Sequence, residues 1–325
     1  MDVSIVICCY NSSERLPVTL EHVSNLLCRN LLYELIIVDN NSNDDTSAVA
    51  EQIWKSLNKT EIKFNLVHEP NVGLTQARMK GVESSSGQYI VFCDDDNWLD
   101  SSYLHTAVRF LKRNPSVGII GGKIEGILEG NKPDWWESDQ SNFAVGSQAI
   151  SSGDITRRGY LWGAGMVVRK NIVEVVYFGK IELMLVDRMG KQLSSGGDSE
   201  LCQLAIFMGY KLWYLEDLKL SHFIPKTRLT DGYRDKLKIG LKSSHPVLHR
   251  YMFFNKYVNY YTNRYNKSRL VQTIKRLIKL ILGKLNDQKQ KNLLQMGLGK
   301  WIRIDPIMTR IIDSYEKLSN GARYR

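Results

Sequence analysis

The residues best suited to chemistry in this sequence are three consecutive aspartates, Asp94, Asp95 and Asp96, which follow the apolar run 89–93 (YIVFC). Such a run is typical of a buried strand, and side chains at its carboxyl end line the crevice where open α/β sheets bind ligands. Three adjacent carboxylates repel one another, and a divalent cation that prefers oxygen ligands would relieve the repulsion. The alternative is that these acids cap a helix beginning near Ser101.

A further carboxylate, Asp198, follows Gly196 and Gly197 at the start of a predicted helix. Glycines let the backbone approach a ligand closely. A carboxylate held there could take the proton of a hydroxyl during displacement at a sugar carbon, or it could simply cap the helix. His222 lies beside an apolar pair, where a lone histidine is more often structural. Opposite an aspartate-rich cation site, it becomes a candidate metal ligand.

Polar side chains at other strand ends suit a nucleotide. Tyr10 could stack on a base or pack in its turn. Asp39 and Asn40 end a second apolar run and could bind a base or ribose, or form an Asx-turn. Arg78 lies one turn inside a predicted helix, where its guanidinium would suit a diphosphate, a carboxylate of the aspartate run or solvent.

Alternating patterns predict how these residues are positioned. We expect strands at 3–9, 33–39, 62–67, 88–93 and 117–121, and helices at 15–27, 45–57, 74–85 and 101–113. This alternation predicts an α/β fold with a mostly parallel sheet and helices on both faces. The polar turns then converge on one crevice, because parallel strands end at the same edge. Later elements are helices at 170–177 and 198–208 and a strand at 211–215, after an irregular region at 130–160.

Composition agrees with a soluble globular chain, because hydrophobic residues make up 43% and charged residues 24% of 325 positions. No apolar stretch approaches the roughly 18 residues of a bilayer span. A strand pattern begins directly after Met1-Asp2, so we expect no signal peptide. Five cysteines, an odd number lying mostly in apolar segments, favour reduced thiols in a cytoplasmic protein.

The net charge of +10 is unevenly distributed: residues 226–325 hold 23 Lys and Arg but only 6 Asp and Glu. We therefore expect two domains, an α/β domain over 1–225 and a basic α-helical region over 226–325. Residues 268–285 place apolar side chains at helical spacing among basic ones with no acid. This pattern predicts a helix lying in an anionic membrane interface, on the inner face of the plasma membrane, or a helix packed on the body.

The sequence also bears on two alternative functions. A nucleotidyltransferase should carry a glycine- and lysine-rich phosphate loop after the first strand, and residues 8–11 read Cys-Cys-Tyr-Asn instead. A non-catalytic adaptor that binds a nucleotide sugar at the membrane would not need Asp96, Asp198 and His222 together. No dinucleotide fingerprint, Walker A motif or nucleic-acid recognition motif is present.

Taken in order, the segments resemble the inverting, nucleotide-sugar-dependent glycosyltransferases of family 2, which have the GT-A fold. The resemblance covers roughly residues 2–225 and lies in 3–11, 36–43, 72–87, 88–97, 162–169 and 196–201.

This resemblance implies roles position by position. Asp94-Asp95-Asp96 matches the D-x-D motif, in which the last acid, Asp96, binds Mn²⁺ or Mg²⁺ and the earlier acids face the nucleoside. His222 matches a further metal ligand, and Asp198 matches the catalytic base of the x-E-D motif. Tyr10 and Asp39 match nucleoside contacts, Arg78 matches the basic residue beside the donor, and Gly163 matches the glycine loop under the acceptor. We also expect Asn40 at the donor and Trp162 and Glu200 at the acceptor, with Glu200 as a second candidate base.

Departures from the family pattern also stand out. Gly197 occupies the position of the glutamate in x-E-D, and Asn40 replaces a frequent second acid. No Q-x-x-R-W motif is present, which argues against a polymerising synthase. We therefore expect a metal-dependent transferase that moves a sugar, with a UDP-sugar favoured as donor, to a glycan or lipid-linked acceptor in surface polysaccharide or glycoconjugate synthesis.

Overall fold

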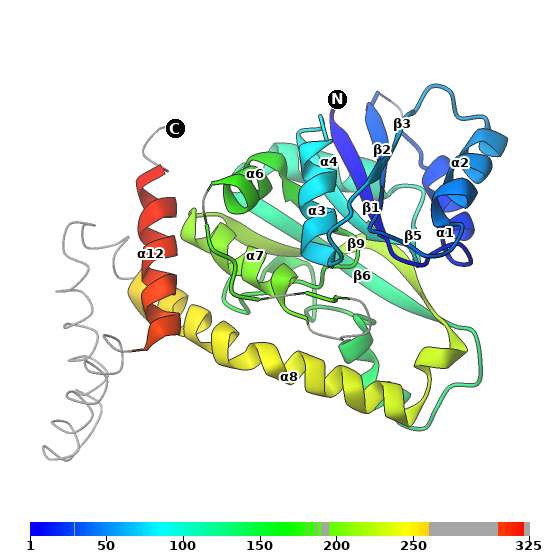
Figure 1. Cartoon of the computed structure of the whole chain (residues 1–325). Helices are drawn as coiled ribbons and strands as arrows, with labels where there is room; N and C mark the ends of the chain where they lie inside the picture. The colour runs from blue at the N-terminus through cyan, green and yellow to red at the C-terminus, as the bar shows by residue number, and fades with distance from the viewer. Residues whose placement is uncertain (29, 180, 186, 190–194, 260–304, 322–325) are drawn as a thin grey trace, which may run out of the picture.

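The fold is built on one twisted mixed sheet, seen in a computed structural model that describes residues 1–28, 30–179, 181–185, 187–189, 195–259 and 305–321 (Figure 1). In these residues the strand order is β3-β2-β1-β4-β8-β6-β9-β5, and β7 pairs with β9. The strands are β1 Val3–Cys9, β2 Tyr33–Asp39, β3 Lys63–His68, β4 Tyr89–Asp94, β5 Asn97–Leu99, β6 Val117–Leu128, β7 Gly153–Asp154, β8 Met166–Arg169 and β9 Lys211–Ile224. The helices are α1 Leu16–Ser24, α2 Thr46–Leu57, α3 Leu74–Glu83, α4 Tyr103–Arg113, α5 Trp136–Asp139, α6 Lys170–Phe178, α7 Gly197–Phe207, α8 Asp231–Phe253 and α12 Pro306–Gly321.

The amino-terminal half of the sheet is parallel, as predicted. β1 lies between β2 and β4, with Cys9 opposite Asp39 and Cys8 opposite Asp94, and β2 carries β3 on its other side. The carboxyl ends of these four strands therefore share one edge of the sheet. β8 runs antiparallel to β4 and β6, which makes the sheet mostly rather than wholly parallel.

Helices cover both faces of the sheet. Alternate residues of β1 point to opposite faces, so each face contributes to its own core. Ile5 and Ile7 face a core shared with α1, α2 and α4, whereas Val6 faces a core shared with α3, α6 and α7. Both sets are fully buried. This two-sided burial explains why the parallel strands read as continuous apolar runs.

β6 and β9 extend well beyond their predicted ends at 121 and 215. The two strands pair with each other over most of their length. Beyond the apolar runs, β9 alternates buried residues, such as Leu218 and Leu220, with the exposed Lys219 between them. Sequence reasoning that looked for continuous apolar runs missed this half-exposed continuation.

The region predicted to be irregular, 130–160, contains only the short α5, a 3₁₀ turn over Gln140–Phe143 and the two-residue β7. After β9, a 3₁₀ turn over Lys226–Arg228 leads into α8, which ends in a π-helical turn over Phe254–Asn259. The structure thus agrees with the predicted change from sheet to helix near Pro225.

Helix α8 runs along the lower side of the molecule in Figure 1 and passes below α7, and α12 packs against both. Tyr251 of α8 and Ile311 of α12 are fully buried in the core that contains α7. The predicted interfacial helix at 268–285 lies outside the described residues. Within the part of the chain that the structure describes, no helix has the length and apolar character required to cross a bilayer.

Candidate active site

The turns that follow β1 to β4 meet at one cavity of about 800 Å³. Its lining includes most of the residues that the sequence singled out, namely Tyr10, Asn40, Arg78, Asp94, Asp95, Asp96, Trp162, Gly163, Asp198 and His222. The convergence expected of a parallel sheet is therefore present, and residues as far apart in the chain as Tyr10 and His222 line the same space.

The aspartate run does not cap a helix. It ends β4 and leads directly into β5, which begins at Asn97, whereas α4 begins only at Tyr103. β5 pairs with the end of β9, which sets Asn97 opposite His222. This pairing brings His222 to the aspartates, although 126 positions separate it from Asp96.

Asp96 is 3% exposed and is the most heavily contacted acid of the run. Arg228 Nη1 donates to its Oδ2 at 2.8 Å, His222 Nε2 lies 3.3 Å from its Oδ1, and Asn97 Nδ2 donates to Oδ1 at 3.2 Å. Burial alone would raise the pKa of this carboxyl, but the adjacent His222 and Arg228 outweigh burial and hold the pKa well below its usual range. Asp96 is therefore ionised throughout the neutral range.

Asp95 is also neutralised by the protein itself. Arg15 Nη2 donates to its Oδ2 at 2.6 Å, the hydroxyl of Ser12 donates to the same oxygen, and the hydroxyl of Thr19 donates to its backbone carbonyl at 2.7 Å. From the sequence, we expected that a divalent cation would relieve the mutual repulsion of the aspartates. In the structure Arg15 and Arg228 also supply positive charge to the run.

Asp94 remains more open than its two neighbours. Burial and the adjacent charge of Asp96 raise the pKa of its carboxyl, with Arg78 and His222 acting in the opposite direction. A partly exposed acid at the carboxyl end of β4 can accept a hydrogen bond from a ligand in the cavity. This position agrees with the expected nucleoside contact.

The chemistry of Asp96 and His222 fits a divalent cation. A hard carboxylate oxygen and an imidazole nitrogen stand 3.3 Å apart at the cavity, and neighbouring ligands on an octahedral ion with bonds of about 2.1 Å lie about 3 Å apart. Among the described residues, no cluster of three or more His, Cys, Asp or Glu side chains forms a cation cage. A cation here would take its other ligands from a diphosphate and water, as Mg²⁺ commonly does.

Asp198 lies across the cavity, at the amino end of α7. Its Oδ2 accepts the backbone N–H of Gly163 at 2.8 Å, and its Oδ1 accepts the N–H of Ser199 at 2.7 Å. Gly196, which precedes the helix, has φ +131°, a conformation that favours glycine. Burial, followed by the nearby Asp187, raises the pKa of Asp198. The geometry fixes the carboxylate at the cavity and strengthens it as a base.

Arg78 is buried rather than solvated. It ion-pairs with Asp187, with Nη1 to Oδ2 at 3.0 Å, and its guanidinium lies over the ring of Phe92 at 5.3 Å. The sequence placed this arginine at the crevice and left a diphosphate, a carboxylate of the aspartate run or solvent open as its partner; the carboxylate that it pairs with is Asp187. Asp187 was missed, because it lies in a segment without helical or strand periodicity.

The predicted nucleoside contacts divide into two groups. Tyr10 lines the cavity and is 37% exposed, so part of its side chain is accessible to a ligand. The side-chain amide of Asn40 ties two turns together: it donates to the carbonyls of Glu69 and Asn71 and accepts the N–H of Gly73. Tyr10 is thus the more available of these two residues.

Asp39 does not line the cavity. Its Oδ1 accepts the N–H of Ser42 at 3.0 Å, and its Oδ2 accepts the hydroxyl of Ser47. These bonds lower the pKa of Asp39 against the opposing effect of burial. Of the two roles considered from the sequence, the described contacts favour the Asx-turn over the ribose contact.

Glu200 is fully buried and also lies outside the lining of the cavity. It accepts the N–H groups of Met184 and Leu185 and the hydroxyl of Tyr251 at 2.9 Å. Burial raises the pKa of Glu200 to about 7. Its contacts anchor the 183–185 segment and α8, and this placement does not favour the predicted acceptor role.

Trp162 and Gly163 do line the cavity. Trp162 belongs to a small cation–π group in which the guanidinium of Arg158 lies 5.6 Å from the Trp162 ring and 4.2 Å from the Tyr160 ring. A Cβ added to Gly163 would lie 2.8 Å from Arg78 Nη2 and 3.2 Å from Asp198 Oδ2, so a side chain at this position would displace Arg78. The two neighbours thus offer an aromatic surface beside a close backbone approach.

Helix α8 forms a wall of the cavity that sequence reasoning missed. Its contributing residues recur at helical spacing and are Leu237, Leu241, Ser244, His245, Leu248, His249 and Met252. The basic character of this region drew attention to its charge rather than to its apolar stripe. The cavity is therefore completed by residues from beyond position 225.

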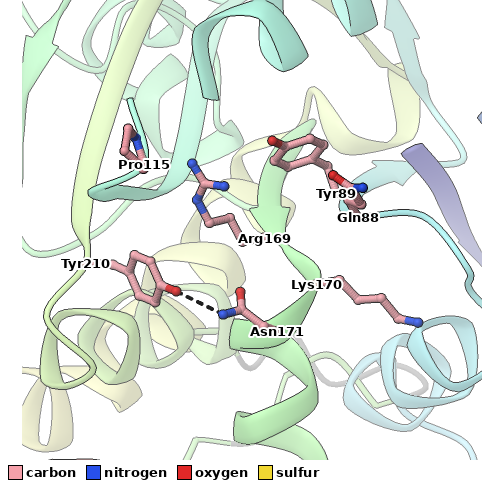
Figure 2. A pocket seen from close by; sticks show the side chains of 7 residues that line it. All are labelled: Gln88, Tyr89, Pro115, Arg169, Lys170, Asn171 and Tyr210. Carbon is pink, nitrogen blue, oxygen red and sulfur yellow. Dashed lines mark hydrogen bonds between the residues drawn. The ribbon is translucent and has the colours of Figure 1, made fainter. Parts of the chain in front are cut away.

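A smaller cavity of about 440 Å³ lies at the other edge of the sheet, where β4 begins and β8 ends (Figure 2). Its Arg169 donates to three backbone carbonyls at the end of α4 and the start of β6, and Lys170 donates to the carbonyl of Ser85. Because these cations already serve the fold, we assign the site to the larger cavity.

A central sheet with acids at the carboxyl ends of its parallel strands and a further carboxylate across the cavity defines an α/β protein with one site at the strand ends. Residues 4–176 match the family described as Glycosyl transferase family 2, and the chain belongs to this family. The glycosyltransferase AglE of Haloferax volcanii is 26% identical over 220 residues, which cover 68% of this chain and 66% of that protein. The matches to the next two curated relatives cover only 29% and 30% of their lengths.

Solved structures share the fold. The chain is similar to S. aureus TarS 1-349 in complex with UDP-GlcNAc, with a TM-score of 0.53 and 13% identity over 100% of this chain and 92% of that one. It is also similar to the mannosyltransferase PcManGT of Pyrobaculum calidifontis in complex with GDP-Man and Mn²⁺, with a TM-score of 0.51 and 14% identity over 99% of this chain and 87% of that one. The predicted α/β, GT-A class is thereby confirmed.

Proposed function

We propose that this protein is a metal-dependent inverting glycosyltransferase that moves a sugar from a nucleoside diphosphate sugar, with a UDP-sugar favoured, to a hydroxyl of a glycan or lipid-linked acceptor. The observation that carries the proposal is the placement of Asp96 with His222 and of Asp198 on the lining of one cavity. The acceptor class and a role in surface polysaccharide or glycoconjugate assembly follow from the family alone.

The donor side is proposed at the carboxyl edge of β1 to β4. Tyr10 offers an exposed ring for stacking on the base, and Asp94 offers an acceptor for hydroxyl or base N–H groups. Asp96 and His222 would hold Mn²⁺ or Mg²⁺, which would neutralise charge on the leaving diphosphate. TarS bound to UDP-GlcNAc and PcManGT bound to GDP-Man and Mn²⁺ support this reading by analogy of fold.

The acceptor side is proposed between Asp198 and the aromatic ring of Trp162. Asp198 takes the proton of the acceptor hydroxyl while that oxygen forms a bond to the anomeric carbon. The bond from this carbon to the diphosphate breaks at the same time, and attack from the opposite face inverts the centre. The N–H groups of Gly163 and Ser199 hold the carboxylate in place, and its raised pKa strengthens the base.

Incubation of the protein with UDP-, GDP- and dTDP-sugars, Mn²⁺ and a panel of glycan and lipid-linked acceptors tests this function. We expect release of the nucleoside diphosphate that depends on both acceptor and cation, with an inverted linkage in the product. Release without acceptor dependence, or retention of the anomeric configuration, would refute the proposal.

We further propose that the protein works at the cytoplasmic face of the plasma membrane, where lipid-linked acceptors are displayed. The basic apolar pattern of 268–285 supports this location through attraction to anionic lipid.

A further inference from the structure

Gly197 occupies the position where the family pattern has a glutamate, and the structure shows what fills the space instead. A Cβ added to Gly197 would lie 2.3 Å from Asp187 Oδ2 and 2.7 Å from Asp187 Cγ. Real Cβ atoms do not approach other atoms so closely, so the carboxylate of Asp187 and a side chain at position 197 exclude each other. Asp187 brings a carboxylate to this point from another part of the chain.

The contacts of Asp187 connect three parts of the site. Its Oδ1 accepts the backbone N–H of Gly197 at 2.7 Å, which bonds it to the first turn of α7. Its Oδ2 accepts from Arg78 of α3 at 3.0 Å. Both side chains of the ion pair are 7% exposed. A buried pair that is hydrogen-bonded on both carboxylate oxygens holds its geometry firmly, because neither charge can be left alone without a large desolvation cost.

Asp198 lies directly beside this arrangement. It follows Gly197 in the chain, and its Oδ2 lies 3.2 Å from the position of a Cβ added to Gly163, a position that is also 2.8 Å from Arg78 Nη2. The Asp198 carboxylate accepts the N–H of Gly163 and the N–H and hydroxyl of Ser199. The titratable and charged groups around it are Arg78 from α3, Asp187, Tyr177 from α6 and Cys202 from α7. Asp187 therefore controls both the backbone that carries Asp198 and the charge beside it.

We infer that Asp187 is a positioning residue for Asp198: its carboxylate takes the place of the side chain that Gly197 lacks and fixes Arg78 and the start of α7 around the base. The inference rests on the proposed function only for the role of Asp198. It assigns to this chain a carboxylate supplied from a separate segment, where the family pattern supplies one from the residue next to the base.

Loss of the Asp187 carboxylate has a defined consequence for the reaction. Arg78 loses its partner and the N–H of Gly197 loses its acceptor, so Asp198 shifts relative to the acceptor hydroxyl. Displacements of about 1 Å at a reacting group cost about 100-fold in rate. Asp96 and Tyr10 remain in place in such a variant, and Arg78 keeps its charge near Asp94, so the KM for the donor should change less than kcat.

The test compares Asp187→Ala, Asp187→Asn, Gly197→Glu and the double variant Asp187→Ala/Gly197→Glu. We expect Asp187→Ala to lower kcat about 100-fold, with the donor KM within about threefold of the wild type. Gly197→Glu alone should lower both Tm and kcat, because the new side chain meets Asp187. The double variant should recover at least about tenfold of the kcat lost in Asp187→Ala, because it restores one carboxylate to one space.

Asp187→Asn keeps the shape and removes the charge, so it separates positioning from folding. The pKa of Asp198, read from the carboxyl ¹³C shift in selectively labelled protein, should fall in this variant, and the acid limb of kcat/KM should move to lower pH. An unchanged pKa together with an unchanged kcat in Asp187→Asn would overturn the inference. A folded double variant no more active than Asp187→Ala would also overturn it. A wild type that binds no nucleotide sugar and transfers no sugar would instead count against the proposed function, and the ¹³C measurement still decides the relationship between the two acids.

Discussion

The guanidinium of Arg228 lies against Asp96, with Nη1 to Oδ2 at 2.8 Å, on the carboxylate that would hold a cation. Arg228 comes from the 3₁₀ turn that follows β9, six residues after His222. A metal ion bound at Asp96 would therefore compete with a protein cation for one buried acid. Arg228 offsets the negative charge of Asp96, as Arg15 does for Asp95.

Replacement of Arg228 should consequently strengthen cation binding to the donor-free protein. We expect Arg228→Gln to bind Mn²⁺ about tenfold more tightly, a difference of about 1.4 kcal/mol. The same variant should have a lower Tm without metal, because Asp96 keeps its charge and loses a buried partner. Titration of free Mn²⁺ by electron paramagnetic resonance measures the affinity, and Lys80→Gln, which breaks an exposed pair with Glu83, is the control. Equal or weaker Mn²⁺ binding by Arg228→Gln would contradict this account.

The pH dependence of transfer should reflect Asp198. As a base it must be ionised, so kcat/KM rises as pH increases through its pKa. Burial and Asp187 raise that pKa, which places the acid limb above the ordinary aspartate value of about 3.9. The measurement is a pH profile of kcat/KM for the acceptor, with both the donor and Mn²⁺ at saturating concentrations. A limb at or below the ordinary value would show that the carboxylate is not the base in this environment.

Glu200 should leave a signature in stability rather than in transfer. Its folded pKa of about 7 lies above the ordinary value of 4.5, so the folded state binds the proton more tightly than the unfolded state. The free energy of unfolding therefore decreases as pH rises from about 4.5 to 7, by an amount on the order of 3 kcal/mol. Urea unfolding at a series of pH values should show this decrease in the wild type, and Glu200→Gln should remove that component.

Membrane docking can be tested with substitutions in the basic pattern, which lies outside the described residues. Replacing Lys275, Arg276 and Lys279 with glutamine removes three charges from the basic pattern of 268–285. Binding to vesicles that contain anionic lipid, measured by flotation, should then weaken by about 3 kcal/mol, at about 1 kcal/mol per charge. A triple variant of Lys55, Lys59 and Lys63 provides a charge-matched control. Equal flotation of both variants and the wild type would refute the docking proposal.

Much of the fold and part of the site could be predicted because local patterns specify them. β1, β2 and β4 are buried on both faces and read as apolar runs. Parallel strands must bring their carboxyl ends together, which predicted that Tyr10 and Asp94 lie near one cavity. The aspartate run could be recognised because three acids directly follow an apolar strand pattern.

The missed residues depend on contacts that no local pattern encodes. Asp187 and Arg228 lie in irregular segments and meet Arg78 and Asp96 only through the tertiary fold, across 109 and 132 positions of sequence. Asp39 and Glu200 look like site residues in the sequence. An acid at a strand end or in the first turn of a helix has the same pattern whether it faces a cavity or accepts backbone N–H groups. Their hydrogen bonds to Ser42 and Met184 became visible only in three dimensions.

In the proposed mechanism Asp96 holds the cation and the donor diphosphate, and Asp198 takes the proton of the acceptor. A thermal-shift titration with UDP and GDP, with and without Mn²⁺, tests it most directly when paired with product formation by Asp96→Asn and Asp198→Asn. We predict that Asp96→Asn loses the Mn²⁺-dependent shift, whereas Asp198→Asn keeps the shift and loses at least about 100-fold in transfer. The opposite pattern, or no metal-dependent stabilisation of the folded wild type by either nucleotide, would contradict the claim.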